Sequence, residues 1–142
     1  MIHNLSEYFL PQQEFYLDNI VYNRLEKNSE NLEYSLNCID TIHTSLEENG
    51  IKIIITRILK FEPEEIFEVS VSFGAFLTFN PQKKDDYNWY ELNLSEEFRE
   101  NGEFVVSNLA HRISLLISQI TSSFGQTPII LPPHLASKPS TS

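Results

Sequence analysis

The chain has 142 residues and a formal net charge of −10, from 10 Lys and Arg against 20 Asp and Glu. With 41% hydrophobic and 12% aromatic residues, one domain of this length can build a core without a disulfide or a metal. The acidic balance argues against nucleic acid and anionic membrane surfaces as partners, because both require clustered Lys and Arg.

The first segment carries no targeting signal. Met1 to Leu10 lacks the basic region and apolar run of a signal peptide, and no stretch of about 18 apolar residues occurs along the chain. We therefore expect a cytoplasmic protein with no membrane insertion. A weak strand pattern then runs from Phe15 to Leu25.

Three further segments alternate between apolar and polar residues, as strands do. The apolar faces of the first two are formed by Leu32, Tyr34, Leu36 and Cys38, and by Ile51, Ile53, Ile55, Leu59 and Phe61. The polar stretch Ser45 to Gly50 marks the far boundary of the first of them. The third strand is the clearest, with an apolar residue at every odd position from Phe67 to Phe79. Pro63 and two acidic residues connect the last two strands, which predicts a hairpin.

Helical signals follow the strands. Residues 80–86 (NPQKKDD) interrupt the pattern, and a single helical turn is expected next, capped by Ser95 and ended by Asn101 and Gly102. From Phe104 the period changes to three or four, which predicts a helix of about 20 residues with Gly125 as its cap. Its apolar stripe consists of Leu109, Ile113, Leu116, Ile120 and Phe124. Leu115 and Ile117 lie outside this line, so part of the helix is expected to face another subunit.

Prolines hold the exit from the helix, Gln126 to Leu135, in an extended conformation. Ala136 to Ser142 (ASKPSTS) is expected to be a disordered tail. The prediction is therefore a single α+β domain over residues 1–135, in which a four-stranded antiparallel sheet packs with one long C-terminal helix.

The sequence offers little for catalysis. His3, His43, His111 and His134 lie in different predicted elements without metal-ligand spacing, so no metal site is expected. Cys38 sits mid-strand, where a free cysteine normally serves as a small hydrophobic residue. No phosphate-binding or nucleophile-elbow motif occurs, so we expect neither a cofactor nor catalytic residues, and not an enzyme.

The order of the segments resembles the export chaperone SecB and its SecB-like relatives, from Gln13 to Leu135. Phe15, Leu17 and Ile20 fit the F-x-I-x-x-I pattern of the family's first strand, and LEYSLNCIDT fits its V-K-L-D-L-D-T strand. A hairpin and a long helix with the start NLAHR follow, and the exit FGQTPIILPPHL is similar to the family's L-A-P-V-N-F segment.

The resemblance implies an ATP-independent chaperone, a dimer of dimers, that holds unfolded or partly folded client proteins in apolar grooves. We place the client surface on the second strand and the helix exit, at Leu32, Tyr34, Leu36, Cys38, Ile129, Ile130 and Leu131. The alternative is that these side chains pack under the long helix as ordinary core. The interface of the homotetramer is assigned to the helix stripe Leu109, Ile113, Leu116 and Ile120.

Two departures from the family leave the biological role open. The family's second helix has no counterpart, because only ASKPSTS follows Leu135. Ile66 and Glu68 fit the segment with which the family docks the motor SecA, but Arg24 stands where the first strand would carry an acid. A role in protein export and a dedicated client such as an antitoxin are both open.

Two other functions compete with the chaperone interpretation. One is a protein-protein interaction module that assembles a complex without chaperoning. The other is a thioesterase of the hot-dog type, in which the long helix lies between early strands, whereas here it follows all four predicted strands.

Overall fold

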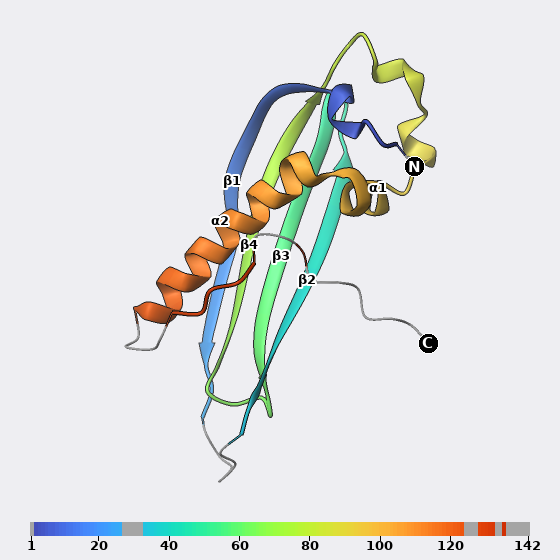
Figure 1. Ribbon diagram of the computed structural model, residues 1–142. Helices are drawn as coiled ribbons and strands as arrows, with labels where there is room; N and C mark the ends of the chain where they lie inside the picture. The colour runs from blue at the N-terminus through green and yellow to red at the C-terminus, as the bar shows by residue number, and fades with distance from the viewer. Residues whose placement is uncertain (1, 27–32, 124–127, 133–134, 136–142) are drawn as a thin grey trace.

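Four long strands form one antiparallel sheet, and the longest helix crosses one of its faces (Figure 1). The computed structural model describes residues 2–26, 33–123, 128–132 and 135, so the expected tail, residues 136–142, lies outside the described part. In chain order the elements, with 3-10 helices written η, are η1 (Leu5–Tyr8), β1 (Phe9–Arg24), β2 (Ser35–Leu46), β3 (Gly50–Glu62), β4 (Phe67–Phe79), η2 (Lys84–Asp86), η3 (Trp89–Glu91), α1 (Leu94–Asn101) and α2 (Glu103–Ser122). The predicted α+β fold, with the long helix after all four strands, is confirmed.

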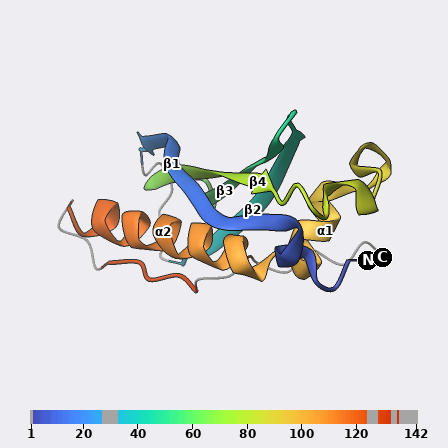
Figure 2. The same ribbon diagram turned by 90° about the horizontal axis from the view of Figure 1, so that it is seen from above.

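The strands lie in the order β1-β4-β3-β2, and every neighbouring pair is antiparallel. Hairpins join β2 to β3 and β3 to β4, as Pro63 between the latter two predicts, whereas β1 pairs with the distant β4. Seen from above, α2 runs along one side of the sheet (Figure 2). We call this side the helix face and the opposite side the outer face.

The predicted alternation in β3 and β4 is confirmed on the helix face. Ile51, Ile53, Ile55 and Leu59 are fully buried, and the odd-numbered residues of β4 are buried apart from the half-buried Phe73. Such alternation lets one face of a strand enter the core while the other stays wetter. Arg57 lies on the same face of β3 and is equally buried, which the apolar pattern of this strand does not predict.

β2 ends close to the boundary indicated by the polar stretch Ser45 to Gly50, but it begins later than its apolar pattern predicts. It begins at Ser35, so Tyr34 precedes it, and Leu32 lies outside the described residues. Its even-numbered residues continue along the helix face through Asp40 as far as Leu46, opposite the odd-numbered residues of β3. Asp40 interrupts the apolar alternation, but the strand continues beyond it.

The prediction of a single turn capped by Ser95 is wrong in both respects. α1 has eight residues, and its N-cap is Asn93, whose side-chain oxygen accepts a hydrogen bond from the backbone N–H of Glu96. Asn caps a helix as well as Ser does, and it precedes Ser95 in the chain. The Ser95 hydroxyl instead lies 3.1 Å from the Thr44 hydroxyl of β2. Gly102 ends α1, as expected.

The stripe of α2 that packs on the sheet differs from the expected one. Leu109 and Ile113 are 0% exposed, and Ile117, which was expected outside the central line, is also fully buried. Leu116 and Ile120 are half-buried, whereas Leu115 is 55% exposed. Leu109 and Ile113 are therefore occupied by their own sheet and are not available to a second subunit in this conformation.

The end of α2 also differs from the prediction. Its C-cap is Ser123, whose backbone N–H donates to the carbonyls of Gln119 and Ile120. Phe124 and Gly125, expected at the end of the stripe and as the cap, lie outside the described residues.

We predict that Ile113→Asp unfolds the chain instead of dissociating subunits. A carboxylate placed at a fully buried core position should lower the free energy of unfolding by about 3 kcal/mol or more. Asn108→Asp, at an exposed position of the same helix, is the matched control, with an expected change within about 0.5 kcal/mol. Urea denaturation followed by circular dichroism measures both, and equal losses for the two variants would contradict this packing of α2.

Candidate functional site

The extended exit from α2 returns along the helix face of the sheet. Ile129 and Leu131 pack against the core, and the backbone N–H of Ile129 donates to the Thr121 hydroxyl of α2 at 2.9 Å. Ile130 between them is 83% exposed. One side of this segment is thus held on the core while the other presents an isoleucine to solvent.

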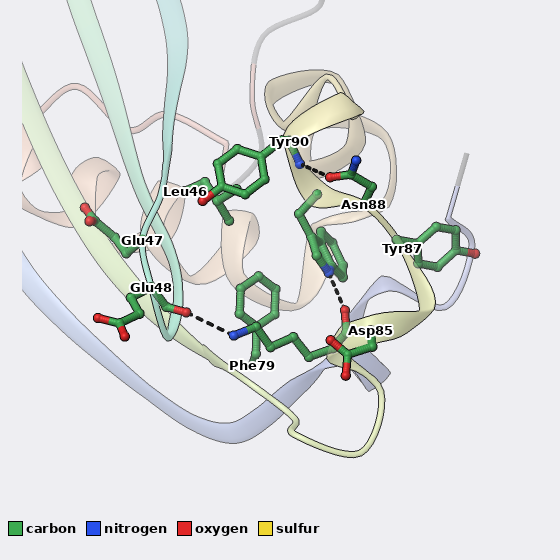
Figure 3. Close-up of a pocket in the computed structure, with 10 residues that line it drawn as sticks. Leu46, Glu47, Glu48, Phe79, Asp85, Tyr87, Asn88 and Tyr90 are labelled. Atoms are coloured by element: carbon green, nitrogen blue, oxygen red, sulfur yellow. Dashed lines mark hydrogen bonds between the residues drawn. The ribbon is translucent and has the colours of Figure 1, made fainter.

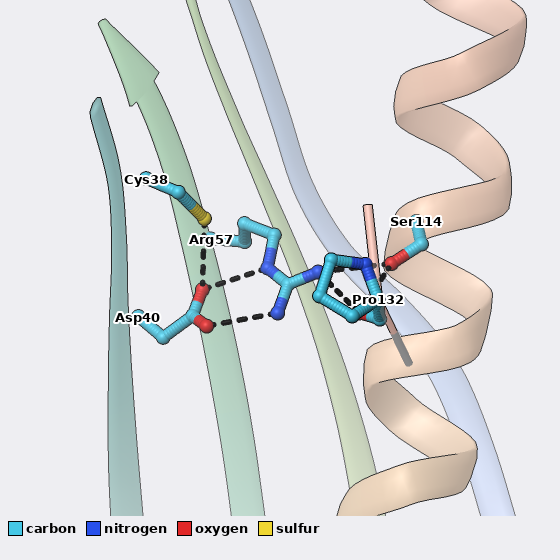
Figure 4. Close-up of polar contacts among 5 residues, drawn as sticks. All are labelled: Cys38, Asp40, Arg57, Ser114 and Pro132. Carbon is cyan, nitrogen blue, oxygen red and sulfur yellow. Dashed lines mark hydrogen bonds and ion pairs between the residues drawn. The ribbon is translucent and has the colours of Figure 1, made fainter. Parts of the chain in front are cut away.

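A buried ion pair joins this exit segment to the sheet (Figure 4). Asp40 of β2 and Arg57 of β3 are directly opposite in the register, and their side chains are 0% and 2% exposed. Arg57 Nε and Nη2 each donate to one carboxylate oxygen of Asp40 at 2.8 Å. Arg57 Nη1 donates to the Ser114 hydroxyl of α2 and to the Pro132 carbonyl, both at 2.9 Å.

The electrostatics of this cluster keep the arginine charged and the neighbouring thiol neutral. Burial alone would lower the pKa of Arg57, but the hydrogen bonds and charge of Asp40 raise it above its ordinary value. Burial, together with the Asp40 charge, raises the pKa of Cys38, whose Sγ lies 3.7 Å from the Asp40 carboxylate. Cys38 is therefore a protonated thiol at neutral pH, which is not an activated nucleophile.

The predicted client-binding residues of β2 lie on the helix face beside this cluster. Leu36 is 39% exposed and Cys38 is half-buried. The Tyr34 hydroxyl donates to a Glu65 carboxylate oxygen at 2.7 Å, and its ring packs edge-on against Phe61. Tyr34 is thus held by contacts within the fold, and Leu36 is the more accessible of these apolar side chains.

The structure brings the two predicted halves of the client surface together. Arg57 contacts Asp40 of β2 on one side and Pro132 of the exit segment on the other. The exposed side chains of Leu36 and Ile130 therefore belong to two segments that meet at one buried ion pair. We call these two segments, with their accessible apolar side chains, the β2–exit surface.

Ile66 and Glu68, the expected motor-docking pair, do not share a face. Ile66 has a positive φ of 75°, rare for a β-branched residue, and its side chain packs against the core. Glu68 lies on the outer face, where Asn23 Nδ2 donates to it at 3.2 Å and Lys60 Nζ lies 3.9 Å away. The left-handed backbone at Ile66 breaks the alternation that would otherwise place the two side chains on one face of the sheet.

A cavity that the sequence does not reveal lies beside the β2–β3 turn (Figure 3). It has a volume of about 330 Å³, and its walls include Leu46, Phe79, Trp89 and Tyr90. Lys84 Nζ donates to the Glu48 carbonyl at 3.2 Å and lies 5.8 Å from the centre of the Phe79 ring. Trp89 Nε1 donates to the Lys84 carbonyl at 2.8 Å, so part of the polar lining of the cavity is already bonded, and we assign no ligand to it.

Comparisons with known proteins give a match in structure alone. No family model and no curated protein matches the sequence. The structure is similar to that of the Mycobacterium tuberculosis SecB-like chaperone Rv1957 in complex with a ChAD peptide from the HigA1 antitoxin Rv1956. The TM-score is 0.66 over 89% of this chain and 91% of that chain, at 11% sequence identity.

The chain has the SecB-like fold. The resemblance in segment order, including the long helix after the fourth strand, is thereby confirmed at the level of the fold. The solved SecB-like neighbour is a chaperone, and its peptide comes from an antitoxin.

Two further findings concern the described residues alone. Within ranges 2–26, 33–123, 128–132 and 135, no three His, Cys, Asp or Glu side chains are grouped so that they could hold a metal ion. In the same part of the chain, no helix has the length and apolar character needed to cross a membrane.

We predict that Asp40→Leu lowers the free energy of unfolding by about 3–5 kcal/mol, because it leaves the Arg57 guanidinium buried without its counter-charge. The double variant Asp40→Leu with Arg57→Met should lose much less, since no charge remains in the core. Lys60→Met, which removes the half-exposed pair with Glu68, is the control, with an expected loss below about 1 kcal/mol. Urea denaturation measures the free energy of unfolding of each variant, including Arg57→Met alone. If the double variant loses as much as the sum of the Asp40→Leu and Arg57→Met losses, the two residues are not coupled.

Proposed function

We propose that the protein is a cytoplasmic, ATP-independent chaperone of the SecB-like kind that holds non-native client chains. The observation that carries the proposal is its fold, which is that of a chaperone solved with a bound antitoxin peptide. The β2–exit surface supports it, because it leaves apolar side chains accessible beside a firmly held core.

The proposed mechanism is burial of a client's apolar segment on the β2–exit surface. Ile130 and Leu36 offer accessible apolar area, and the half-buried Ile129, Leu131 and Cys38 extend it. Removing such area from water is favourable by about 25 cal/mol per Å² and needs no nucleotide. The net charge of −10 would keep a loaded complex in solution.

A dedicated client, such as an antitoxin, fits the structure better than a general role in export. The solved neighbour was captured with an antitoxin peptide. Docking to the SecA motor through Ile66 and Glu68 has weaker support, because these side chains point to different sides of the sheet. Arg24, on the neighbouring strand β1, pairs with Phe67 and adds a positive charge close to Glu68.

We predict that the purified protein delays aggregation of reduced, unfolded α-lactalbumin, and that ATP makes no difference. Light scattering at 360 nm follows the reaction. A plain interaction module would leave the aggregation curve unchanged. Turnover of an acyl thioester by the same preparation would favour the hot-dog enzyme instead.

Ile130→Ser should weaken binding of the same client by about 1–3 kcal/mol, roughly 5- to 150-fold in Kd, because it removes an accessible apolar contact. The melting temperature should stay unchanged, since this side chain is 83% exposed. Tyr90→Ser, which changes an exposed aromatic residue at the distant cavity, is the matched control and should keep full affinity. A large fall in melting temperature for Ile130→Ser would show that the residue belongs to the core.

The proposed assembly is a homotetramer, a dimer of dimers. The burial of Leu109 and Ile113 moves the proposed helix contact to the accessible side of α2, at Leu115, Leu116 and Ile120. Multi-angle light scattering should report four copies of the 16.5 kDa chain, and Leu115→Asp should shift the population towards dimers. A monodisperse monomer at micromolar concentration would exclude the tetramer.

A further inference from the structure

The hydrogen-bond pattern of the sheet identifies which backbone groups of β2 face its free edge. The N–H of Glu47 donates to the Gly50 carbonyl, so the odd-numbered residues of β2 bond to β3. The bond from Phe79 N–H to the Asn49 carbonyl gives the same parity from the β4 side. The N–H and C=O groups of Leu36, Cys38 and Ile42 therefore point away from the sheet, and in the described part of the chain no other backbone group bonds to them.

This edge lacks the features that normally protect an exposed strand. Residues 35–46 contain no Lys, Arg, Glu, Pro or Gly, and their one acidic side chain, Asp40, is buried against Arg57. Pairing with β3 runs without a register shift from Ser35 to Leu46. Exposed edge strands are usually blunted by charges, prolines or bulges, because an open edge is a template for another strand.

The opposite edge of the sheet shows the contrast. β1 contains Pro11, and its pairing with β4 shifts register between Phe9 and Gln13 and again between Leu17 and Asn19. These are the features by which a sheet edge resists strand addition. One edge of the sheet is therefore blunted, while the other pairs in a regular register and carries no exposed Lys, Arg, Asp or Glu.

We infer that β2 binds an extended segment of a partner chain as a fifth strand of the sheet. The inference rests on the proposed function and specifies how the client is recognised: by main-chain hydrogen bonds to Leu36, Cys38 and Ile42. The contact between Thr44 and Ser95 places α1 at the far end of the strand and limits the open stretch there.

Charge favours a neutral or basic partner segment over a second copy of this chain. The proposed contacts between copies lie on the accessible side of α2 and leave the β2 edge free, and the net charge of −10 on each copy opposes a further edge-to-edge pairing of two copies. Alternate side chains of the added strand would lie beside Leu36 and Cys38 on the helix face and beside Ile39 and Thr41 on the outer face.

Residue-resolved amide hydrogen exchange on the full chain, with and without reduced, unfolded α-lactalbumin, tests the inference. The amides of Leu36, Cys38 and Ile42 should exchange quickly in the free protein and at least about tenfold more slowly with the client bound. The amides of Ile39 and Thr41 already bond to β3 and should not change. Protection at every second residue distinguishes strand pairing from simple covering by side chains.

The other outcomes each overturn the inference. If aggregation is suppressed while these three amides exchange as in the free protein, the client binds by side chains only, and the proposed function survives without the fifth strand. If the three amides become protected without client as protein concentration rises, a second copy occupies the edge. If the client is not held at all, the proposed function fails together with the inference.

A pair of variants separates the amide from the side chain. Cys38→Pro removes an outward N–H, whereas Cys38→Ser keeps it and alters the side chain only slightly. Relative to Cys38→Ser, the proline variant should bind the same client about two- to tenfold more weakly, the effect of one lost hydrogen bond. Equal affinities would contradict the inference, and if the proline variant does not fold, the exchange measurement on the unaltered chain decides.

Discussion

The buried pair of Asp40 and Arg57 is the interaction on which the arrangement of the other elements depends. Two charges in a core are costly unless their hydrogen-bonding groups are satisfied, and here the guanidinium reaches β2, α2 and the exit segment at once. The pair also fixes the strand register. A slip of β2 by one residue would turn Asp40 to the outer face and leave Arg57 without a counter-charge.

Regular periodicity accounts for the part of the fold that could be predicted from the sequence. β3, β4 and α2 have long, uninterrupted apolar patterns, and they were found at nearly their true bounds. The pattern failed where polar groups replace apolar ones in the core. Asp40 and Arg57 each stand on an otherwise apolar face of adjacent hairpin strands, a signal that would have indicated a buried pair.

The remaining differences come from tertiary contacts and backbone geometry that a periodic pattern does not contain. Ile117 lies on the side of α2 that packs on the sheet and is fully buried, and Ile66 leaves the outer face because its φ is positive. For the client surface, alternation and prolines indicated which segments to consider. Only the three-dimensional arrangement shows that Arg57 contacts both segments and that the Tyr34 hydroxyl bonds to Glu65.

The pairing of β1 with β4 has a consequence for how the chain comes to be folded. During synthesis the first strand emerges before the partner with which it pairs, since Phe9 lies opposite Phe79 and β2 and β3 are made in between. The β2–β3–β4 meander is local and can close early, whereas docking of β1 requires a large chain loop to be closed first. A nascent chain of this protein therefore passes through a stage in which a 16-residue strand is unpaired, and it is itself exposed to aggregation until β4 has been made.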